Sequence, residues 1–358
     1  MTIHENHPLQ QLTTFGTPAV ARRLVVLELA ATDDPSHLDR EVGELLASGL
    51  LDGDYLILGG GSNVVFTRDY PGTIITLCPG CTLCCGGENG KYLTAPASLE
   101  LDLAVDYCVA HNLFGGVENL SAIPGTVGGA VVQNAGAYGV EVGDFVDCVH
   151  ALDLHKRCRV SLSREECRFG YRTSVFKEQP GRYLILEVRF RFAAEFSPVL
   201  KYKALADELQ HRGVSNPSQR QMRDLITDIR WGKLPRPQEY GSAGSFFKNP
   251  VVDEATYLHL REQYPDMPDA HPTRHLEHST SNIQQSGLTY KLSAAWLIDR
   301  AGWKGRTLGR AGVWPRQALV LYNTGGCTGQ EVLDLASAIQ REVFSKFHVQ
   351  LPPEAIII

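Results

Sequence analysis

The sequence lacks several features that define common protein classes. No window approaches the ~18 consecutive apolar residues of a membrane-spanning helix, so we expect no membrane insertion. The first ten residues, MTIHENHPLQ, are polar and contain no apolar signal core, which predicts a cytoplasmic protein. The formal net charge is −6, so the chain lacks the positive excess that binding nucleic acid through bulk charge requires.

The 358-residue chain has nine cysteines, an odd number. This number argues against a disulfide framework and predicts reduced thiols. Four of them lie between 78 and 85 with spacing like an iron–sulfur run, but the fourth ligand before a proline is missing. The insertion at 265–285 has three histidines at helical spacing, but its prolines favour a solvated loop. We predict no metal site from either group: Cys78, Cys81, Cys84 and Cys85, or His271, His275 and His278.

Glycine is concentrated in one stretch, residues 115–139 (GGVENLSAIPGTVGGAVVQNAGAYG). Because glycine loses the most conformational entropy on folding, this composition argues against a regular helix or strand. Glycine allows close backbone approach, and successive N–H groups in turns bind anions. Apolar residues within the run, such as Val127 and Val131, argue against a flexible linker. We therefore predict that the stretch wraps a phosphate-bearing cofactor.

A second glycine-rich turn, Gly59-Gly60-Gly61-Ser62-Asn63, follows an expected strand at 55–58. The dinucleotide-binding fingerprint would require a third glycine at Val64 and then a helix, but residues 65–66 have the character of a strand. The Walker pattern is absent as well. This turn is expected to hold a pyrophosphate without the help of a helix.

Hydrophobic periodicity and capping residues predict the main elements. The polar segment between Phe192 and Pro237 indicates the main domain boundary. The expected elements are helices at 33–50 (capped by Ser36), 98–116 (ending at Gly115-Gly116) and 291–301, strands at 73–77 (after a turn at 70–72) and 183–192, and a final helix with a Thr328–Glu331 capping box.

Four motifs stand in the order and spacing of one family: GGGSN (59–63), IPGTVGGAVVQNAGAYG (123–139), YRTSVFK (171–177) and GSAGSFFKNP (241–250). From Phe15 to Glu354 the chain resembles the UDP-N-acetylenolpyruvoylglucosamine reductases (MurB), flavoenzymes of peptidoglycan precursor synthesis and hence of cell-wall biogenesis. The resemblance implies an α+β fold, with two FAD-binding subdomains of the vanillyl-alcohol-oxidase (PCMH) type and an α/β substrate-binding domain. The implied boundaries are 1–72, 73–226, 227–349 and 350–358, the last segment carrying a catalytic glutamate.

The resemblance also implies roles for individual residues. Arg172 matches the family's catalytic arginine, Ser245 its proton-donating serine and Glu354 its C-terminal glutamate. Expected substrate contacts are Tyr202, Lys233, Asn249 and Gln317; Tyr202 lies in PVLKY, which marks the branch with a tyrosine loop over the nucleotide-sugar. Expected FAD contacts are Gly59, Gly60, Gly61, Ser62, Asn63, Ser121, Ile123, Pro124, Gly125, Gly128, Gly129, Asn134, Gly136, Ala137, Tyr138 and Gly139.

The implied reaction is the NADPH-dependent, FAD-mediated reduction of UDP-N-acetylglucosamine enolpyruvate to UDP-N-acetylmuramate, with noncovalent FAD. Hydride reaches the methylene carbon, and negative charge develops on the neighbouring carbon and its carboxylate. A guanidinium such as that of Arg172 can stabilise this charge. A positioned hydroxyl such as that of Ser245 can then protonate the carbon.

Two alternatives stay open. One is a hydroxy-acid or sugar oxidase of the same flavin fold, a class that commonly tethers flavin through histidine or cysteine and lacks the GSFFKNP donor. The other is a catalytically impaired FAD-binding protein, because only Ala355-Ile356-Ile357-Ile358 follows Glu354 where the family continues further. The expected partners are the UDP-sugar and NADPH, with a monomer favoured and the oligomeric state open.

Overall fold

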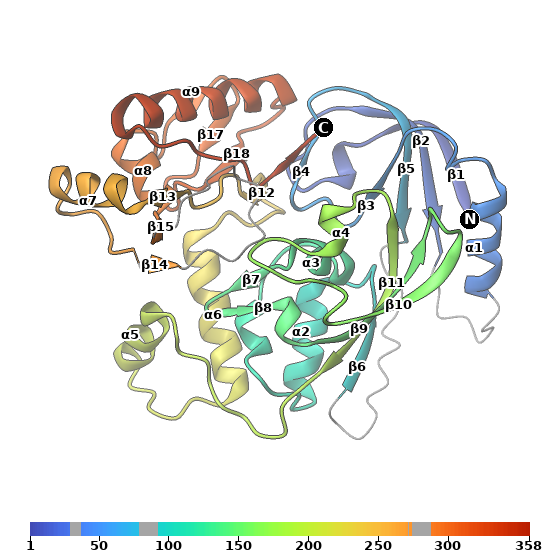
Figure 1. Ribbon diagram of the computed structural model, residues 1–358, viewed down its shortest axis with the longest axis horizontal. Helices are drawn as coiled ribbons and strands as arrows, with labels where there is room; N and C mark the ends of the chain where they lie inside the picture. Colours follow the sequence, from blue (N-terminus) through green and yellow to red (C-terminus); the bar gives the residue numbers. More distant parts are fainter. Residues whose placement is uncertain (29–36, 79–91, 271, 274–287) are drawn as a thin grey trace. The chain divides into compact units, whose positions relative to one another are not determined.

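The computed structural model describes residues 1–28, 37–78, 92–270, 272–273 and 288–358 (Figure 1). Ser36, Cys81, Cys84, Cys85, His271, His275 and His278 lie outside the described residues. The chain divides into two compact units, which we describe one at a time. Unit 1 comprises Met1–Pro8, Val20–Ser62 and Asp69–Gly232, and unit 2 comprises Leu9–Ala19, Asn63–Arg68 and Lys233–Ile358. The four-part division expected from the sequence stays a prediction.

Unit 1 is built on two four-stranded sheets. The first has the order β1 (Thr2–Pro8), β2 (Val20–Leu27), β5 (Tyr70–Leu77), β3 (Tyr55–Leu58), and the second β10 (Cys158–Ser163), β9 (Val146–Asp153), β11 (Tyr183–Arg191), β6 (Tyr92–Pro96). The helices of this unit are α1 (His37–Ala47), α2 (Leu101–Ala110), α3 (Val127–Gln133), α4 (Val175–Glu178), α5 (Lys203–His211) and α6 (Gln219–Lys233), with short 3-10 turns η2 (Val117–Leu120) and η3 (Val142–Asp144) and a small hairpin of β7 (Gly136–Ala137) and β8 (Val140–Glu141).

Strand β5 begins three residues earlier than expected. The predicted Tyr70-Pro71-Gly72 turn is wrong, because these residues belong to the strand at a break in the β2–β5 register. Proline is tolerated in a sheet at such a bulge, where no ladder hydrogen bond is required of it. A Cβ on Gly72 would lie 2.3 Å from the Asp54 carbonyl oxygen, so glycine is required there.

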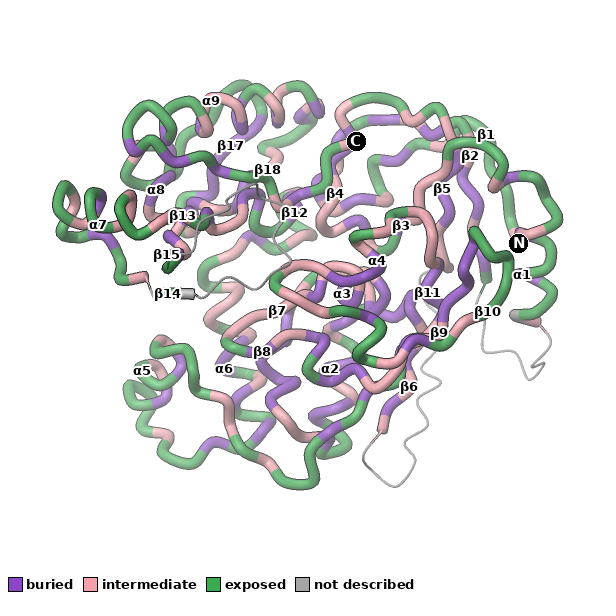
Figure 2. Tube along the Cα trace, viewed as in Figure 1, coloured by how far each residue is buried: buried purple, intermediate pink, exposed green. Residues whose placement is uncertain are grey.

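The strand predicted at 183–192 is confirmed as β11, but its apolar side chains do not share one face as a regular alternation would place them; they enter two separate cores. A register irregularity between Ile185 and Glu187 changes which side chains point to which side. Leu184 and Leu186 pack in the core with α1 and β2, whereas Val188 and the residues beyond it pack in the core with α2 and α3. Buried residues follow the strands of this sheet, while α5 is largely exposed (Figure 2). One strand thus joins the two halves of unit 1.

Helix α2 ends five residues before the predicted Gly115-Gly116 stop, so that boundary is wrong. Its C-cap is His111, and Asn112 follows with φ +56°, the left-handed conformation that glycine more often supplies after a helix. The early end frees residues 111–126 to form the irregular chain that leads into the glycine-rich stretch.

In its described residues, unit 2 contains a four-stranded sheet, a three-stranded sheet and three α-helices. The sheets have the orders β12 (Gly241–Ser245), β18 (Val320–Asn323), β17 (Ala311–Val313), β16 (Thr307–Leu308) and β13 (Val251–Asp253), β15 (Thr289–Lys291), β14 (Pro272–Thr273). The helices are α7 (Glu254–Gln263), α8 (Ala294–Arg300) and α9 (Gly329–Phe347), and β4 (Val64–Val65) pairs in parallel with β19 (Ile356–Ile357).

The final helix confirms its sequence prediction. Thr328 and Glu331 form the reciprocal capping box, and the predicted apolar stripe of α9 is buried in the core of unit 2. Among the helices that the structure describes, none combines the length and the apolar character needed to cross a membrane.

Candidate active site

Two glycine-rich segments meet within unit 1. A Cβ on Gly60 would lie 3.0 Å from the Cα of Gly125, and a Cβ on Gly125 would lie 2.4 Å from the Ser62 hydroxyl oxygen. Gly125 has φ +112°, which disfavours any side chain there. The two turns therefore touch at distances that only glycine permits, and they line one cradle with backbone atoms.

The first turn offers unused hydrogen-bond donors. The backbone N–H groups of Gly60, Gly61 and Ser62 donate no hydrogen bond to the described chain. Consecutive backbone N–H groups of this kind form anion-binding nests. Without an anion, these N–H groups must donate their hydrogen bonds to water. The residues present therefore fit the pyrophosphate of a dinucleotide cofactor.

The glycine-rich stretch is not wholly irregular, so that prediction is wrong in part. Residues 127–133 form helix α3, whose N-cap Thr126 accepts a hydrogen bond from the Gly129 N–H. A Cβ on Gly128 would lie 2.9 Å from the Cβ of Ala97, so Gly128 is a packing residue of the core. A Cβ on Gly129 would meet only the Thr126 hydroxyl oxygen at 3.4 Å. Of the two, Gly129 is the one with open space beside it.

Arg172 lies directly across the hairpin of β7 and β8. Its guanidinium donates to the Gly136 carbonyl oxygen at 2.9 Å and to the Asn134 carbonyl oxygen at 3.5 Å, with the Glu141 carboxylate 4.0 Å away. Its backbone has φ +55°, which is uncommon outside glycine and costs energy that the surroundings must supply. The structure thus holds the arginine in a strained position against the predicted cofactor segment.

Asn134 has a different role from a simple cofactor contact. It ends α3 with φ +45°, and its side-chain amide donates to the Glu141 carboxylate (2.7 Å) and the Gly170 carbonyl oxygen (2.9 Å). Its side-chain oxygen accepts from the Gly143 N–H at 2.9 Å. These three hydrogen bonds use most of the amide's donors and acceptors. The Asn134 side chain therefore joins the segments around Arg172.

The loop carrying Tyr202 packs on the same region of unit 1. The Tyr202 and Tyr138 rings meet edge to face with centroids 5.7 Å apart, and a Cβ on Gly139 would lie 3.0 Å from the Cβ of Lys201. Asn119 donates to the carbonyl oxygens of Tyr138 and Val199, both at 3.0 Å. Asn119 therefore ties the two loops together; the sequence analysis missed it, because no local pattern marks its partners.

Unit 2 turns Ser245 out of its core through an extra residue in β12. Ser242 pairs with Tyr322 but Ser245 pairs with Val320, so β12 has one residue more than β18 at this point. Gly244, with φ +65°, sits in this bulge. Ala243 and Phe246 are buried, whereas Ser245, which would otherwise share a face with Ala243, is exposed.

Backbone hydrogen bonds bring Glu354 next to Ser245. The Glu354 N–H donates to the Phe246 carbonyl oxygen at 2.8 Å, and Phe247 bridges to Pro353. The following residues pair with β4, where the Ile356 N–H donates to the Asn63 carbonyl oxygen at 2.8 Å. The Asn63 amide donates to the Glu354 carbonyl oxygen at 3.2 Å, so this predicted cofactor residue also fixes the C-terminal segment.

The other predicted substrate contacts in unit 2 lie in turns and at helix ends. The Asn249 side-chain oxygen accepts from the Ala294 N–H at the start of α8, and the Gln317 side-chain oxygen accepts from the Leu319 N–H. Leu319 in turn accepts from the Phe246 N–H, which places the Gln317 turn beside the Ser245 strand. Lys233 is the exposed last residue of α6, and its carbonyl oxygen accepts from the Trp314 indole.

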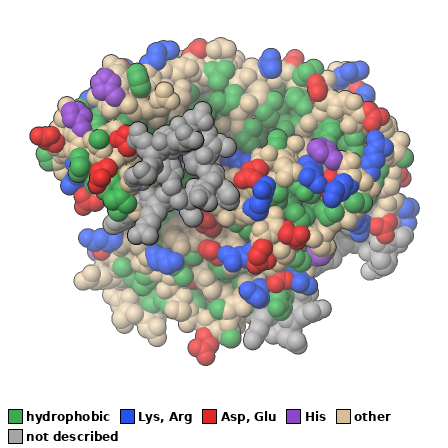
Figure 3. Space-filling view, viewed as in Figure 1, with side chains coloured by type: hydrophobic (Ala, Val, Ile, Leu, Met, Phe, Trp, Pro, Cys, Tyr) green, Lys and Arg blue, Asp and Glu red, His purple; other side chains and the backbone are tan. Residues whose placement is uncertain are grey.

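The structure assembles the predicted site residues as two groups. Unit 1 holds Arg172 and Tyr202 with the glycine-rich segments, and unit 2 holds Ser245, Glu354 and the remaining predicted substrate contacts. Within the described part of the chain, no group of three or more His, Cys, Asp or Glu side chains is arranged to hold a metal. Burial raises the pKa of the Cys167 and Cys327 thiols to about 12, so both stay protonated and unreactive. On the face drawn in Figure 3, acidic and basic side chains are interspersed over the described residues.

Two family models match separate parts of this chain. The family model "UDP-N-acetylenolpyruvoylglucosamine reductase, C-terminal domain" matches residues 236–358, and "FAD binding domain" matches residues 52–157. Two proteins named UDP-N-acetylenolpyruvoylglucosamine reductase are 41% identical to this chain: one from Burkholderia ambifaria (strain MC40-6) over 362 residues, and one from Azoarcus sp. (strain BH72) over 363 residues. Both alignments cover 100% of this chain, with 97% and 98% of the relatives.

A solved structure shares the fold. The crystal structure of UDP-N-acetylenolpyruvylglucosamine reductase (MurB) from Thermus caldophilus superposes with a TM-score of 0.62 at 24% identity, covering 99% of this chain and 98% of that one.

Proposed function

Because this chain belongs to the UDP-N-acetylenolpyruvoylglucosamine reductase family, we infer that it catalyses the NADPH-dependent reduction of UDP-N-acetylglucosamine enolpyruvate to UDP-N-acetylmuramate. The predicted α+β flavin fold and the FAD cofactor are confirmed by the matched FAD-binding domain and the shared fold. The chain is therefore a flavin-dependent oxidoreductase of peptidoglycan precursor synthesis.

We propose that the two glycine-rich segments of unit 1 hold FAD without a covalent bond. Bound FAD supplies the hydride relay from NADPH to the substrate. The turn at 59–62 would contact the pyrophosphate through its free N–H groups, and residues 121–139 would contact the rest of the cofactor. Acid precipitation should release all of the yellow colour into the supernatant, and flavin retained in the pellet would contradict this.

Arg172 is proposed to stabilise the charge that develops on the substrate. A guanidinium matches a carboxylate in fork geometry and stays charged at any working pH. Its side chain is held by the Gly136 and Asn134 carbonyl oxygens, so little reorganisation is needed when the substrate's enolate-like charge appears. The strained backbone of this residue is consistent with such a role.

Ser245 is proposed to donate the proton, with Glu354 beside it. The observation that carries this proposal is the bulge in β12, which exposes Ser245 between the buried residues Ala243 and Phe246 and sets it one residue from the Glu354 backbone contact. The carbanionic intermediate is a strong base, so position matters more than the acidity of the hydroxyl. We propose that the Glu354 carboxylate assists at the same carbon.

Stopped-flow kinetics of the two half-reactions test the serine. Ser245→Ala should reduce flavin with NADPH at the wild-type rate, because that step needs no proton from the serine. Reoxidation by the enolpyruvyl substrate should slow by about 10²–10⁴-fold, the usual contribution of a positioned general acid. Ser245→Cys should recover part of the rate, because a thiol is the stronger acid.

The matched control is Ser242→Ala, the same substitution in the same strand at a buried position. It should leave both half-reactions nearly unchanged. If Ser245→Ala instead slows flavin reduction and leaves reoxidation intact, Ser245 is not the acid.

A further inference from the structure

Three residues of the predicted cofactor segment have positive φ although they are not glycine: Ala122, Asn134 and Tyr138. Ala122 is buried and has φ +57°, in the left-handed region that disfavours a Cβ. Such a conformation persists only where neighbouring groups hold it. Ala122 immediately precedes Ile123-Pro124-Gly125, so its backbone angles set the direction in which the chain approaches the turn at 59–62.

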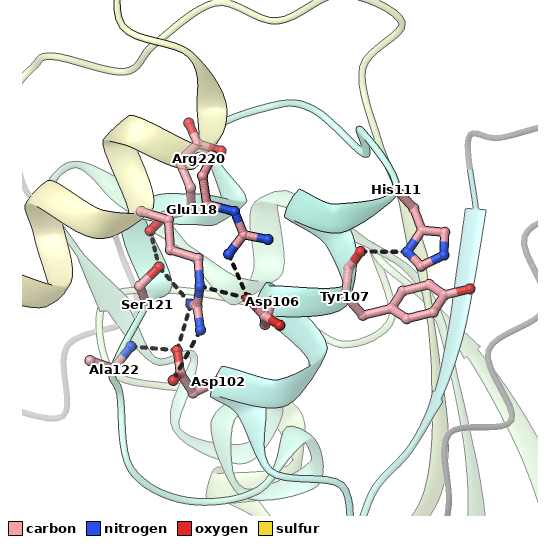
Figure 4. A network of polar contacts seen from close by, with 9 residues as sticks. Asp102, Asp106, Tyr107, His111, Glu118, Ser121, Ala122 and Arg220 are labelled. Atoms are coloured by element: carbon pink, nitrogen blue, oxygen red, sulfur yellow. Dashed lines mark hydrogen bonds and ion pairs between the residues drawn. The ribbon is translucent and has the colours of Figure 1, made fainter.

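Charged side chains from two helices hold both backbone groups of Ala122. Its N–H donates to a carboxylate oxygen of Asp102 on α2 at 2.7 Å, and its carbonyl oxygen accepts from the Arg230 guanidinium of α6 at 3.3 Å (Figure 4 shows the Asp102 contact). Hydrogen bonds to charged groups are stronger than those between neutral groups. Both peptide groups flanking the strained residue are therefore restrained.

Arg223 locks the carboxylate in place. Its guanidinium binds Asp102 through two nitrogens, at 2.7 Å and 3.3 Å, and donates to the Ser121 hydroxyl at 3.0 Å. That hydroxyl donates to the Glu118 carbonyl oxygen at 2.6 Å. Arg223 contacts both α2 and the loop; its side chain is 12% exposed and that of Asp102 is 38% exposed, so solvent screens this ion pair in part.

We propose that Asp102, Arg223 and Arg230 form a clamp that holds Ala122 in its left-handed conformation and thereby shapes residues 121–129 for FAD. These are positioning residues, because they act through the loop backbone. The proposal rests on the assignment of this loop to the cofactor. It predicts that cofactor affinity depends on a helix about a hundred residues away in the sequence.

The test measures the FAD dissociation constant of reconstituted enzyme by fluorescence titration. Asp102→Ala should weaken FAD binding by about ten- to hundredfold, because a hydrogen bond to a charged group is lost. Asp102→Asn keeps an acceptor for the Ala122 N–H but loses the ion pair, so it should lie between wild type and Asp102→Ala. If Asp102→Ala does not fold, the FAD affinity of Asp102→Asn tests the proposal instead.

A second substitution separates the clamp from a general structural role. Asp102→Ala combined with Ala122→Gly should regain most of the lost affinity, because glycine adopts positive φ without a steric cost. A merely structural defect of α2 would not be repaired by this change.

Asp106→Ala is the matched control. Asp106 also lies on α2 and pairs with Arg220 at 2.9 Å and Arg223 at 3.1 Å, but the structure gives it no contact with Ala122. It should keep near wild-type FAD affinity. Equal losses in Asp106→Ala and Asp102→Ala, or no recovery with Ala122→Gly, would overturn the clamp.

Gly129→Val serves as the reference for the loop assignment itself. If Gly129→Val retains flavin, the loop does not bind FAD and the assignment fails. If Gly129→Val loses flavin while Asp102→Ala binds FAD like wild type, the assignment stands and the clamp is wrong.

Discussion

Two segments carry predicted site residues, and the protein holds them by different means. In unit 1, charged side chains of α2 and α6 hold residues 121–129 at Ala122. Within this segment Ala122 and Gly125 have positive φ, a backbone conformation that favours glycine. In unit 2, residues 352–358 are held by backbone hydrogen bonds to residues 246–248 and 63–67. The first segment is thus held through particular side-chain types, whereas the second contributes main-chain groups, which bond other main-chain groups and the side chains of Asn63 and Thr67.

This difference predicts how the C-terminal segment tolerates substitution. A parallel pairing of Ile356-Ile357 with Val64-Val65 uses N–H and C=O groups that any residue except proline supplies. Substitutions after Glu354 that keep these main-chain groups should therefore leave that residue in place. Substitutions in the first segment should instead change cofactor binding even when they are small.

The largest effect is expected at Gly129. Gly129→Val adds bulk where the structure leaves open space beside the first glycine turn, so the folded protein should lose most of its flavin. The flavin-to-protein absorbance ratio of the purified variant measures this. Gly128→Val is the contrast: its side chain would strike Ala97, so we expect it to lower the melting temperature as well, because it overpacks the core.

An intermediate effect is expected at Ile356. Ile356→Pro removes the N–H that bonds the Asn63 carbonyl oxygen, so Glu354 loses part of its support and reoxidation by substrate should slow about tenfold or more. Flavin content should stay at the wild-type level. Ile356→Thr, which keeps the N–H at this 40% exposed position, should react like wild type. Loss of flavin in Ile356→Pro would show that the C-terminal segment also affects cofactor binding, which contradicts the comparison of the two segments.

The smallest effect is expected far from the site, at the cap of α9. The Thr328 N–H and then the Arg310 guanidinium lower the pKa of Glu331 from its ordinary 4.5 to about 2. The carboxylate therefore stabilises the fold fully above about pH 4.5, and this contribution is lost as the pH falls towards 2. Glu331→Gln should lower the melting temperature at pH 7, and its difference from wild type should shrink between pH 4.5 and 2.

The control for this titration is Asp334→Asn on the same helix. Asp334 is exposed and accepts a hydrogen bond from the exposed Gln330 side chain, so its substitution should barely change the melting temperature. A constant difference between wild type and Glu331→Gln across pH 2–4.5 would contradict the pKa argument.

Local signals predicted much of the fold. The capping box and the apolar stripe that predict α9 both lie within the helix itself. The apolar run at 55–58 likewise predicts strand β3. Predictions failed where a distant segment decides the local conformation. Tyr70-Pro71-Gly72 is strand because β2 lies beside it, and α3 is helical because its residues Val127 and Val131 are buried and Thr126 caps it.

The sequence by itself identified the family through four motifs in register, and its glycine positions predict where backbone approaches a cofactor. Only the tertiary structure decided how the predicted site residues are held. Ser245 is exposed because of a one-residue mismatch with β18, and Glu354 is fixed by Asn63, 291 residues away. Ala122 is strained because Asp102 and Arg230 hold it. Such contacts join residues far apart in the chain, so their energies depend on partners that no local pattern of residues can specify.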